Sequence, residues 1–109
     1  MAQVDPRFKG QILTLTRNIR EHYRPQKIIL YGSLAKHKAT RDSDIDIFII
    51  KSTRKRFLDR IKEVFSMVDS DIPIEPIVYT PSEVRRRLSL GDTFVGEILK
   101  EGVLLYEKK

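Results

Sequence analysis

The 109-residue sequence contains no cysteine. Disulfide bonds and thiolate metal sites are therefore excluded, and a reducing compartment such as the cytoplasm is the expected location. The sequence also lacks any apolar run approaching the ~20 residues that a membrane-spanning helix needs. Residues 1–10 do not contain the apolar segment of a signal peptide. We therefore expect a cytoplasmic protein with no membrane partner.

Acidic residues are fewer than basic ones: the sequence has 15 Asp and Glu residues and 21 Lys and Arg residues, which gives a net charge of +6. This balance favours an anionic partner such as a nucleotide, a nucleic acid or an acidic protein, although a solvated basic surface gives the same composition. Because 40% of the residues are hydrophobic and 33% are charged, the chain is expected to be globular. With no linker or repeat in view, residues 1–109 are predicted to form a single domain.

Hydrophobic periodicity predicts alternating helices and strands. Apolar residues at helical spacing from Phe8 to Tyr23 predict an amphipathic first helix that ends before Pro25. We expect strands at residues 27–31, 44–51, 72–79 and 103–106, and further helices at residues 54–67, 81–88 and 92–100. The order predicts an α/β or α+β fold with a small mixed β-sheet flanked by helices.

Local signals refine this prediction. Pro73 and Pro76 cannot donate to a strand ladder, so the third strand should lie at a sheet edge or carry a bulge. Thr80 and Glu83 have the spacing of a helix capping box. We expect Phe94 and Tyr106 to be core residues.

The segment richest in chemistry is Gly32-Ser33, followed after ten residues by Asp44-Ile45-Asp46. Gly32 ends a strand, where a missing Cβ allows close approach to a ligand, and backbone N–H groups at such a turn can bind an anion. Asp44 and Asp46 share one face of a strand with Cα atoms roughly 6.5 Å apart. Their oxygens suit Mg²⁺. A phosphate cradle beside a metal clamp is what phosphoryl and nucleotidyl transfer require.

Competing motifs fail on spacing. An EF-hand loop would need Gly at the position of Ile47 and Glu at the position of Thr53. No second glycine with Lys and Ser or Thr follows Gly32, which excludes a Walker A loop. The structural alternative is a pair of strand-capping aspartates beside an ordinary turn. Two aspartates on one face of an apolar strand repel each other, however, and a metal ion would relieve that repulsion.

Residues 30–33 and 43–47 resemble the signature of the DNA polymerase β-like nucleotidyltransferase superfamily. The short chain is similar to the minimal nucleotidyltransferases, and residues 95–102 and 105–106 resemble the closing helix and strand of that family. The resemblance implies the nucleotidyltransferase fold and a nucleoside triphosphate as the substrate.

Carried over residue by residue, the resemblance implies that Gly32 and Ser33 bind the β- and γ-phosphates. It implies that Asp44 and Asp46 hold two Mg²⁺ ions. Lys36 stands at the position of an arginine found in many members and keeps its charge, and we assign it to nucleotide binding as well. A third carboxylate from a neighbouring strand completes the family site. Glu75 is the only acid at positions 72–79 and is the candidate.

The resemblance further implies AMP transfer from ATP to a hydroxyl of a partner protein. That partner would be a small helical HEPN-type protein, and this chain would be the antitoxin of a toxin–antitoxin pair. The alternative is a catalytically weak binding module that neutralises the same partner by forming a complex. A transferase acting on nucleic acid fits the basic charge but is not favoured, because the chain has no room for a second domain.

Other polar residues have weaker indications. His37 could contact phosphate or act as a base, but a solvated loop histidine is the simpler interpretation. His22 lies near the end of the first helix, where a cation is favoured in any case. The basic runs at residues 54–56 and 85–87 could bind RNA or an acidic partner. Such runs are more often solvated helix faces, and no aromatic residues lie between them to stack on bases.

Overall fold

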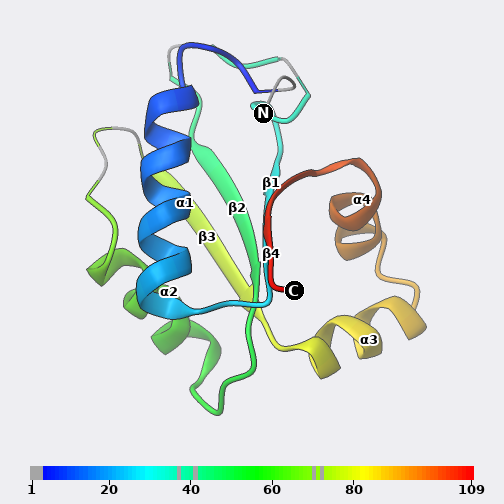
Figure 1. Cartoon of the computed structure of the whole chain (residues 1–109). Helices are drawn as coiled ribbons and strands as arrows, with labels where there is room; N and C mark the ends of the chain where they lie inside the picture. The colour runs from blue at the N-terminus through cyan, green and yellow to red at the C-terminus, as the bar shows by residue number, and fades with distance from the viewer. Residues whose placement is uncertain (1–3, 37, 41, 70, 72) are drawn as a thin grey trace.

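The structure, a computed structural model, describes residues 4–36, 38–40, 42–69, 71 and 73–109. Helices and strands alternate along the chain as the sequence predicts (Figure 1). The elements are α1 (Lys9–Tyr23), β1 (Lys27–Tyr31), β2 (Ile45–Ile50), α2 (Phe57–Ser66), β3 (Ile74–Tyr79), α3 (Pro81–Ser89), α4 (Thr93–Glu101) and β4 (Val103–Glu107). The predicted bounds differ from these by at most three residues at either end.

The four strands form one mixed sheet with the order β3-β2-β1-β4. β1 pairs antiparallel with both β2 and β4, whereas β2 and β3 run parallel. β3 therefore lies at the edge, as its prolines predict. Pro76 lies opposite Ile47 in the register, where its missing N–H can face away from the ladder.

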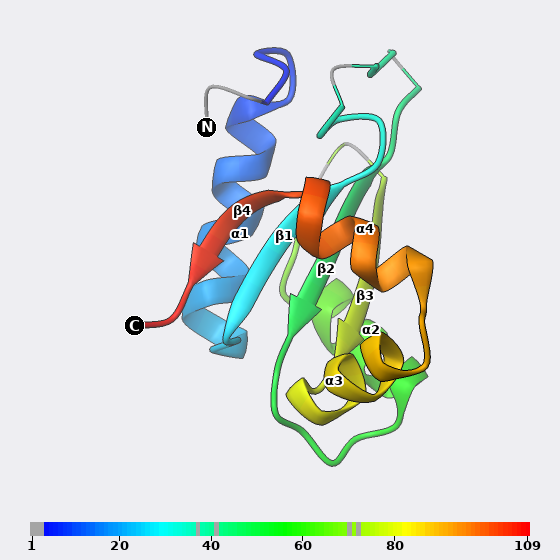
Figure 2. The same cartoon turned by 90° about the vertical axis from the view of Figure 1, so that its right-hand side faces the viewer.

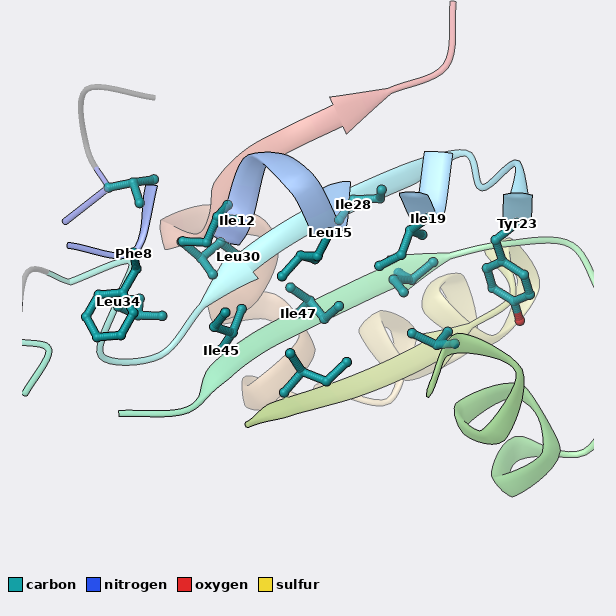
Figure 3. Close-up of a cluster of buried hydrophobic side chains, with 14 of the residues drawn as sticks. Phe8, Ile12, Leu15, Ile19, Tyr23, Ile28, Leu30, Leu34, Ile45 and Ile47 are labelled. Atoms are coloured by element: carbon teal, nitrogen blue, oxygen red, sulfur yellow. The ribbon is translucent and has the colours of Figure 1, made fainter. Parts of the chain in front are cut away.

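The sheet is covered on both faces, with α1 and α2 on one side and α3 and α4 on the other (Figures 1 and 2). Side chains alternate along β2, so that Ile47 joins the cluster under α1 and Phe48 joins the cluster under α3 and α4. Figure 3 shows Ile12, Leu15 and Ile19 of α1 directed at the sheet. Each such buried aliphatic side chain stabilises the fold by about 1.5–3 kcal/mol.

Local capping fixes the corner that joins β3, α3 and α4. The Oγ1 atom of Thr80 accepts the backbone N–H of Glu83 at 3.2 Å, and the Glu83 carboxylate accepts the Thr80 N–H at 2.7 Å. This is the predicted capping box. The carboxylate of Asp92 then accepts the Val95 N–H at the start of α4. None of the helices in the described part of the chain has the length and apolar character needed to cross a membrane.

Candidate functional site

The site begins at the turn that follows β1. Gly32 has a φ of +76°, in the left-handed region that glycine adopts most readily. Its carbonyl accepts the Ala35 N–H at 3.1 Å, and the Ser33 carbonyl accepts the Lys36 and Lys38 N–H groups at 3.2 and 2.9 Å. The residues that follow Ser33 therefore form a hydrogen-bonded turn rather than a helix.

The Ser33 side chain joins the two ends of the loop between β1 and β2. Its hydroxyl donates to the Ser43 Oγ at 3.3 Å, and the same Oγ accepts the Thr40 N–H at 2.8 Å. The loop thus returns to the turn directly before the two aspartates. This contact holds the predicted phosphate-binding residue beside the predicted metal-binding strand.

Gly32 is also required because Asp46 lies against it. Tyr31 and Asp46 are paired residues on the antiparallel strands β1 and β2. A Cβ atom at position 32 would overlap the Oδ2 atom of Asp46. A side chain at this position would therefore meet two obstacles, a backbone angle that it rarely adopts and a carboxylate already in its place. The sequence indicates only that Gly32 allows the close approach of a ligand, whereas both obstacles emerge only from the folded structure.

Asp46 and Glu75 lie side by side. They are paired in the register of the parallel strands β2 and β3, and the two carboxyl groups are close enough for Glu75 to raise the pKa of Asp46. Burial, together with the neighbouring Glu75 and the charge of Asp44, raises the pKa of Asp46 to about 6. Glu75 is exposed on the edge strand, so its carboxylate can also be reached from solvent.

Asp44 lies just before β2 and is half-buried. No group of three or more His, Cys, Asp or Glu side chains within the described ranges is gathered closely enough to count as a formed metal site. The donor chemistry nevertheless fits a hard cation. The charges of Asp44 and Glu75 disfavour the ionised form of Asp46. Mg²⁺, which prefers oxygen ligands and keeps several waters, would relieve this repulsion.

Lys36 follows the Gly32-Ser33 turn, and its side chain lies near the end of α4. Its Nζ atom lies 3.9 Å from the Oε2 atom of Glu101 at the end of α4, and both side chains are about half exposed. An exposed pair of this kind contributes at most about 1 kcal/mol. The ammonium group is thus only loosely held where the structure places it.

The weaker candidates lie elsewhere. His37 is outside the described residues. His22 is exposed on α1, and its Nδ1 atom lies 2.9 Å from the Asn18 carbonyl of the same helix. The basic runs at 54–56 and 85–87 are exposed, in agreement with the solvated interpretation.

Two aromatic residues belong to the site although the sequence did not assign them to it. The rings of Tyr31 and Phe94 meet edge to face with their centroids 5.7 Å apart. Phe94 is 45% exposed, so its prediction as a core residue is wrong. Burial, together with the charges of Asp46 and Glu75, raises the pKa of Tyr31 to about 12, so its hydroxyl remains protonated.

The strand register could have indicated Tyr31, because the residue next to Gly32 pairs with the second aspartate. Phe94 gives no such signal, because its position depends on how α4 packs against β1. Tyr106 lies partly buried against the larger cluster, as expected.

Comparison with known proteins identifies the family and the fold. A family model described as "Polymerase beta, Nucleotidyltransferase" matches residues 14–109. The fold is similar to the crystal structure of a candidate nucleotidyltransferase from Sulfolobus solfataricus, with a TM-score of 0.63 and 20% sequence identity over 99% of this chain and 93% of that one. None of the curated proteins gives a significant match.

The family match spans nearly the whole chain and includes the Gly-Ser turn, both aspartates and Glu75. The mixed sheet with helices on both faces is the nucleotidyltransferase fold. The chain therefore belongs to the polymerase β-type nucleotidyltransferase family.

Proposed function

We propose that the protein is a Mg²⁺-dependent nucleotidyltransferase that transfers AMP from ATP to a hydroxyl of a partner protein. The observation that carries this proposal is the contact of the Gly32 turn with Asp46, which in turn lies beside Glu75. A phosphate-binding turn and a set of carboxylates thus meet at one end of the sheet. Carboxylates held together at a cost to their ionised form are typical of functional sites, which supports the proposal.

Each residue has a distinct role in this proposal. The backbone N–H groups and hydroxyl of the Gly32-Ser33 turn bind the β- and γ-phosphates, with Lys36 released from Glu101 to assist. Asp44, Asp46 and Glu75 would hold two Mg²⁺ ions, which supply positive charge to the phosphate oxygens. Tyr31 remains a hydrogen-bond donor beside the carboxylates.

The reaction is an in-line displacement at the α-phosphorus. The acceptor oxygen forms a bond to that phosphorus, the bond to the β-phosphate oxygen breaks, and pyrophosphate leaves. Glu75, which is exposed and adjacent to Asp46, accepts the proton of the acceptor hydroxyl. The site is open to solvent at this edge strand, which leaves room for a hydroxyl carried by another protein.

The partner we propose is a small helical HEPN-type protein in a cytoplasmic toxin–antitoxin pair, with this chain as the antitoxin. The support is the sequence resemblance to minimal nucleotidyltransferases. The alternative is a binding module that neutralises the partner without efficient catalysis. It is favoured by the lack, over the described ranges, of a formed three-ligand metal group.

The test is mass spectrometry of the partner encoded by the neighbouring reading frame, incubated with this protein, ATP and Mg²⁺. We expect one added AMP per modified hydroxyl, and no addition with the Asp46→Asn variant or with EDTA. Stable complex formation with no AMP added by the wild-type protein would favour the binding module instead.

A further inference from the structure

A cavity of about 240 Å³ lies beside the proposed phosphate-binding turn. It lies between residues at the end of β1 and residues of α4 and is open on one side. These two elements pack against each other (Figure 2). The lining residues that matter here are Tyr31, Gly32, Phe94, Glu97, Ile98 and Glu101. Through Gly32 the cavity borders the turn, and through Tyr31 it borders Asp46 and Glu75.

The lining of the cavity is unsuited to phosphate. Its walls are mostly apolar, with the Tyr31 and Phe94 rings at one side and Ile98 at its base. Its charged groups are mainly carboxylates, since Glu97 and Glu101 are four residues apart on α4 and share one face of that helix. Anionic phosphates would be repelled, whereas a neutral planar ring with N–H donors would find both apolar contact and acceptors.

The two carboxylates differ in availability. Glu101 lies 3.9 Å from the ammonium group of Lys36. Glu97 is exposed and has no hydrogen-bond or ion-pair partner among the residues that the structure describes. Glu97 is therefore the acceptor at this cavity that a ligand can reach without displacing a protein contact.

We propose that this cavity binds the base of the nucleotide, with the ring against Phe94 and an exocyclic amino group donating to Glu97. The inference rests on the proposed function, because it assigns the remainder of the nucleotide whose triphosphate the Gly32 turn would hold. The cavity is smaller than the ~300–1,000 Å³ of pockets that enclose a whole ligand. It suits a single ring system whose sugar and phosphates lie outside it.

The carboxylate of Glu97 also predicts which bases the cavity should prefer. Adenine presents an amino group on its pairing edge, whereas uracil presents a carbonyl oxygen at the equivalent position. A carbonyl facing Glu97 would leave two acceptors opposed without a hydrogen between them. The cavity therefore favours ATP over UTP.

The first experiment separates base binding from phosphate binding by calorimetry with Mg²⁺. ATP and inorganic tripolyphosphate are titrated into the wild type, Phe94→Ala and the matched control Phe65→Ala, which removes a similarly exposed ring on α2. Since stacking of a base on an aromatic ring is worth ~1–3 kcal/mol, Phe94→Ala should weaken ATP binding about tenfold or more. Tripolyphosphate binding should stay unchanged, and Phe65→Ala should behave as the wild type.

The second experiment measures the ratio of ATP to UTP affinity in Glu97→Gln, with Glu21→Gln on α1 as the control. Because a glutamine side chain both donates and accepts, we expect the preference for ATP to fall by about tenfold in Glu97→Gln only.

The outcomes distinguish the inference from the proposed function. Equal loss of ATP and tripolyphosphate binding in Phe94→Ala, or no loss of either, would overturn base binding at this cavity while leaving the transferase proposal in place. An unchanged ATP to UTP ratio in Glu97→Gln would also overturn it. If the wild type binds neither ATP nor tripolyphosphate, the proposed function fails, and the inference fails with it.

Discussion

The two ends of the sheet differ in whether the protein itself neutralises their charged side chains. Where β3 leads into α3, Arg60 is only 6% exposed, yet its guanidinium is fully engaged. It donates to Glu83 at 2.7 Å, to the Val78 carbonyl at 3.1 Å and to the Lys55 carbonyl at 2.8 Å. Where β2 and β3 begin, Asp46 lies beside Glu75, and both are acids.

This difference separates a structural end from a functional end. Arg60 and Glu83 satisfy each other, so that end of the domain is complete without any ligand. The pKa of Asp46, in contrast, is raised by burial and by like-charged neighbours. Its carboxylate is therefore unfavourable unless it takes up a proton or binds a cation. Charge that the protein leaves uncompensated marks the place where an external group is expected.

The largest effect is expected from Asp46→Asn, and a similar one from Asp44→Asn. Either change should reduce nucleotide transfer to background, because the remaining carboxylates cannot hold the metal ions on the phosphates. Since the change also removes a repelling charge, the melting temperature of the metal-free protein should rise or stay the same. Near-normal transfer with Mg²⁺ would show that the site is misassigned, and unfolding of both variants would show that the aspartates are structural.

At the other end, Arg60→Met should destabilise the fold by about 1–3 kcal/mol. The Val78 and Lys55 carbonyls lose their donor, whereas the Glu83 carboxylate, which is 42% exposed, can be solvated by water. The measurement is urea unfolding followed by circular dichroism. The double variant Arg60→Met, Glu83→Leu is the control, since removing both charges should recover part of the loss. If the free energy of unfolding of the single variant decreases by less than about 1 kcal/mol, the ion pair behaves like an exposed one. That result would contradict the proposed difference between the two ends.

Glu75→Gln tests the acid at the edge of the carboxylate end. A general base contributes about 10²–10⁴-fold to rate, so transfer should slow by that factor while ATP still binds. Single-turnover kinetics and ATP calorimetry together make the measurement. An unchanged rate with altered solubility would assign Glu75 to the protection of an edge strand.

Ser33→Ala should have a smaller effect than the aspartate changes, because most of the phosphate cradle consists of backbone N–H groups. Loss of one hydrogen bond to a charged group costs about 1.5–3 kcal/mol, which predicts a ten- to hundredfold decrease in transfer. ATP calorimetry should give the same order of variants. An inert Ser33→Ala would indicate that the hydroxyl serves only its contact with Ser43.

The smallest effect is a pH dependence of opposite sign at the two ends. Although burial alone would raise the pKa of Glu83, hydrogen bonds from Arg60 and Thr80 outweigh it and hold that pKa below its usual 4.5. The stability that Glu83 contributes is therefore present above pH 4.5 and is lost as the pH falls. The destabilising effect of Glu83→Gln should then shrink at low pH.

Asp46 should show the reverse. Its folded-state pKa of about 6 lies above the unfolded value of ~3.9, so the folded protein holds the proton more tightly. Ionisation destabilises the metal-free fold as the pH rises from about 4 to 6. Melting curves at several pH values should show that the melting temperature of Asp46→Asn exceeds that of the wild type only as the pH rises. A gain that is largest at pH 4 would contradict the raised pKa.

Much of the fold follows from local pattern. The alternation along β2 predicts both of its faces, and the Thr80 capping box is confirmed because it needs only neighbours in the chain. The spacing of Gly32, Asp44 and Asp46 predicts where the site lies. Their chemical roles, and that of Glu75, stay predictions.

What the sequence could not predict depends on packing between distant segments. In the sequence, Arg60 follows a basic run and resembles a solvated cation. It is buried only because α2 packs against β3, where its guanidinium donates to the Val78 carbonyl. Phe94 is a large apolar residue of the kind usually found in a core. The position of α4 instead places its ring beside Tyr31, at the edge of the cavity. The overlap of Asp46 with a side chain at position 32 requires the strand register as well.

The central claim, that the carboxylate end requires a cation and the Arg60 end does not, is tested most directly by Mg²⁺ titration at pH 7.5 followed by melting temperature. A ligand that binds only the folded state raises this temperature progressively as its concentration increases above its Kd. The wild type and Glu83→Gln should both gain stability with Mg²⁺, whereas Asp46→Asn should not. An equal gain in Asp46→Asn, or no gain in the wild type even with ATP present, would contradict the account.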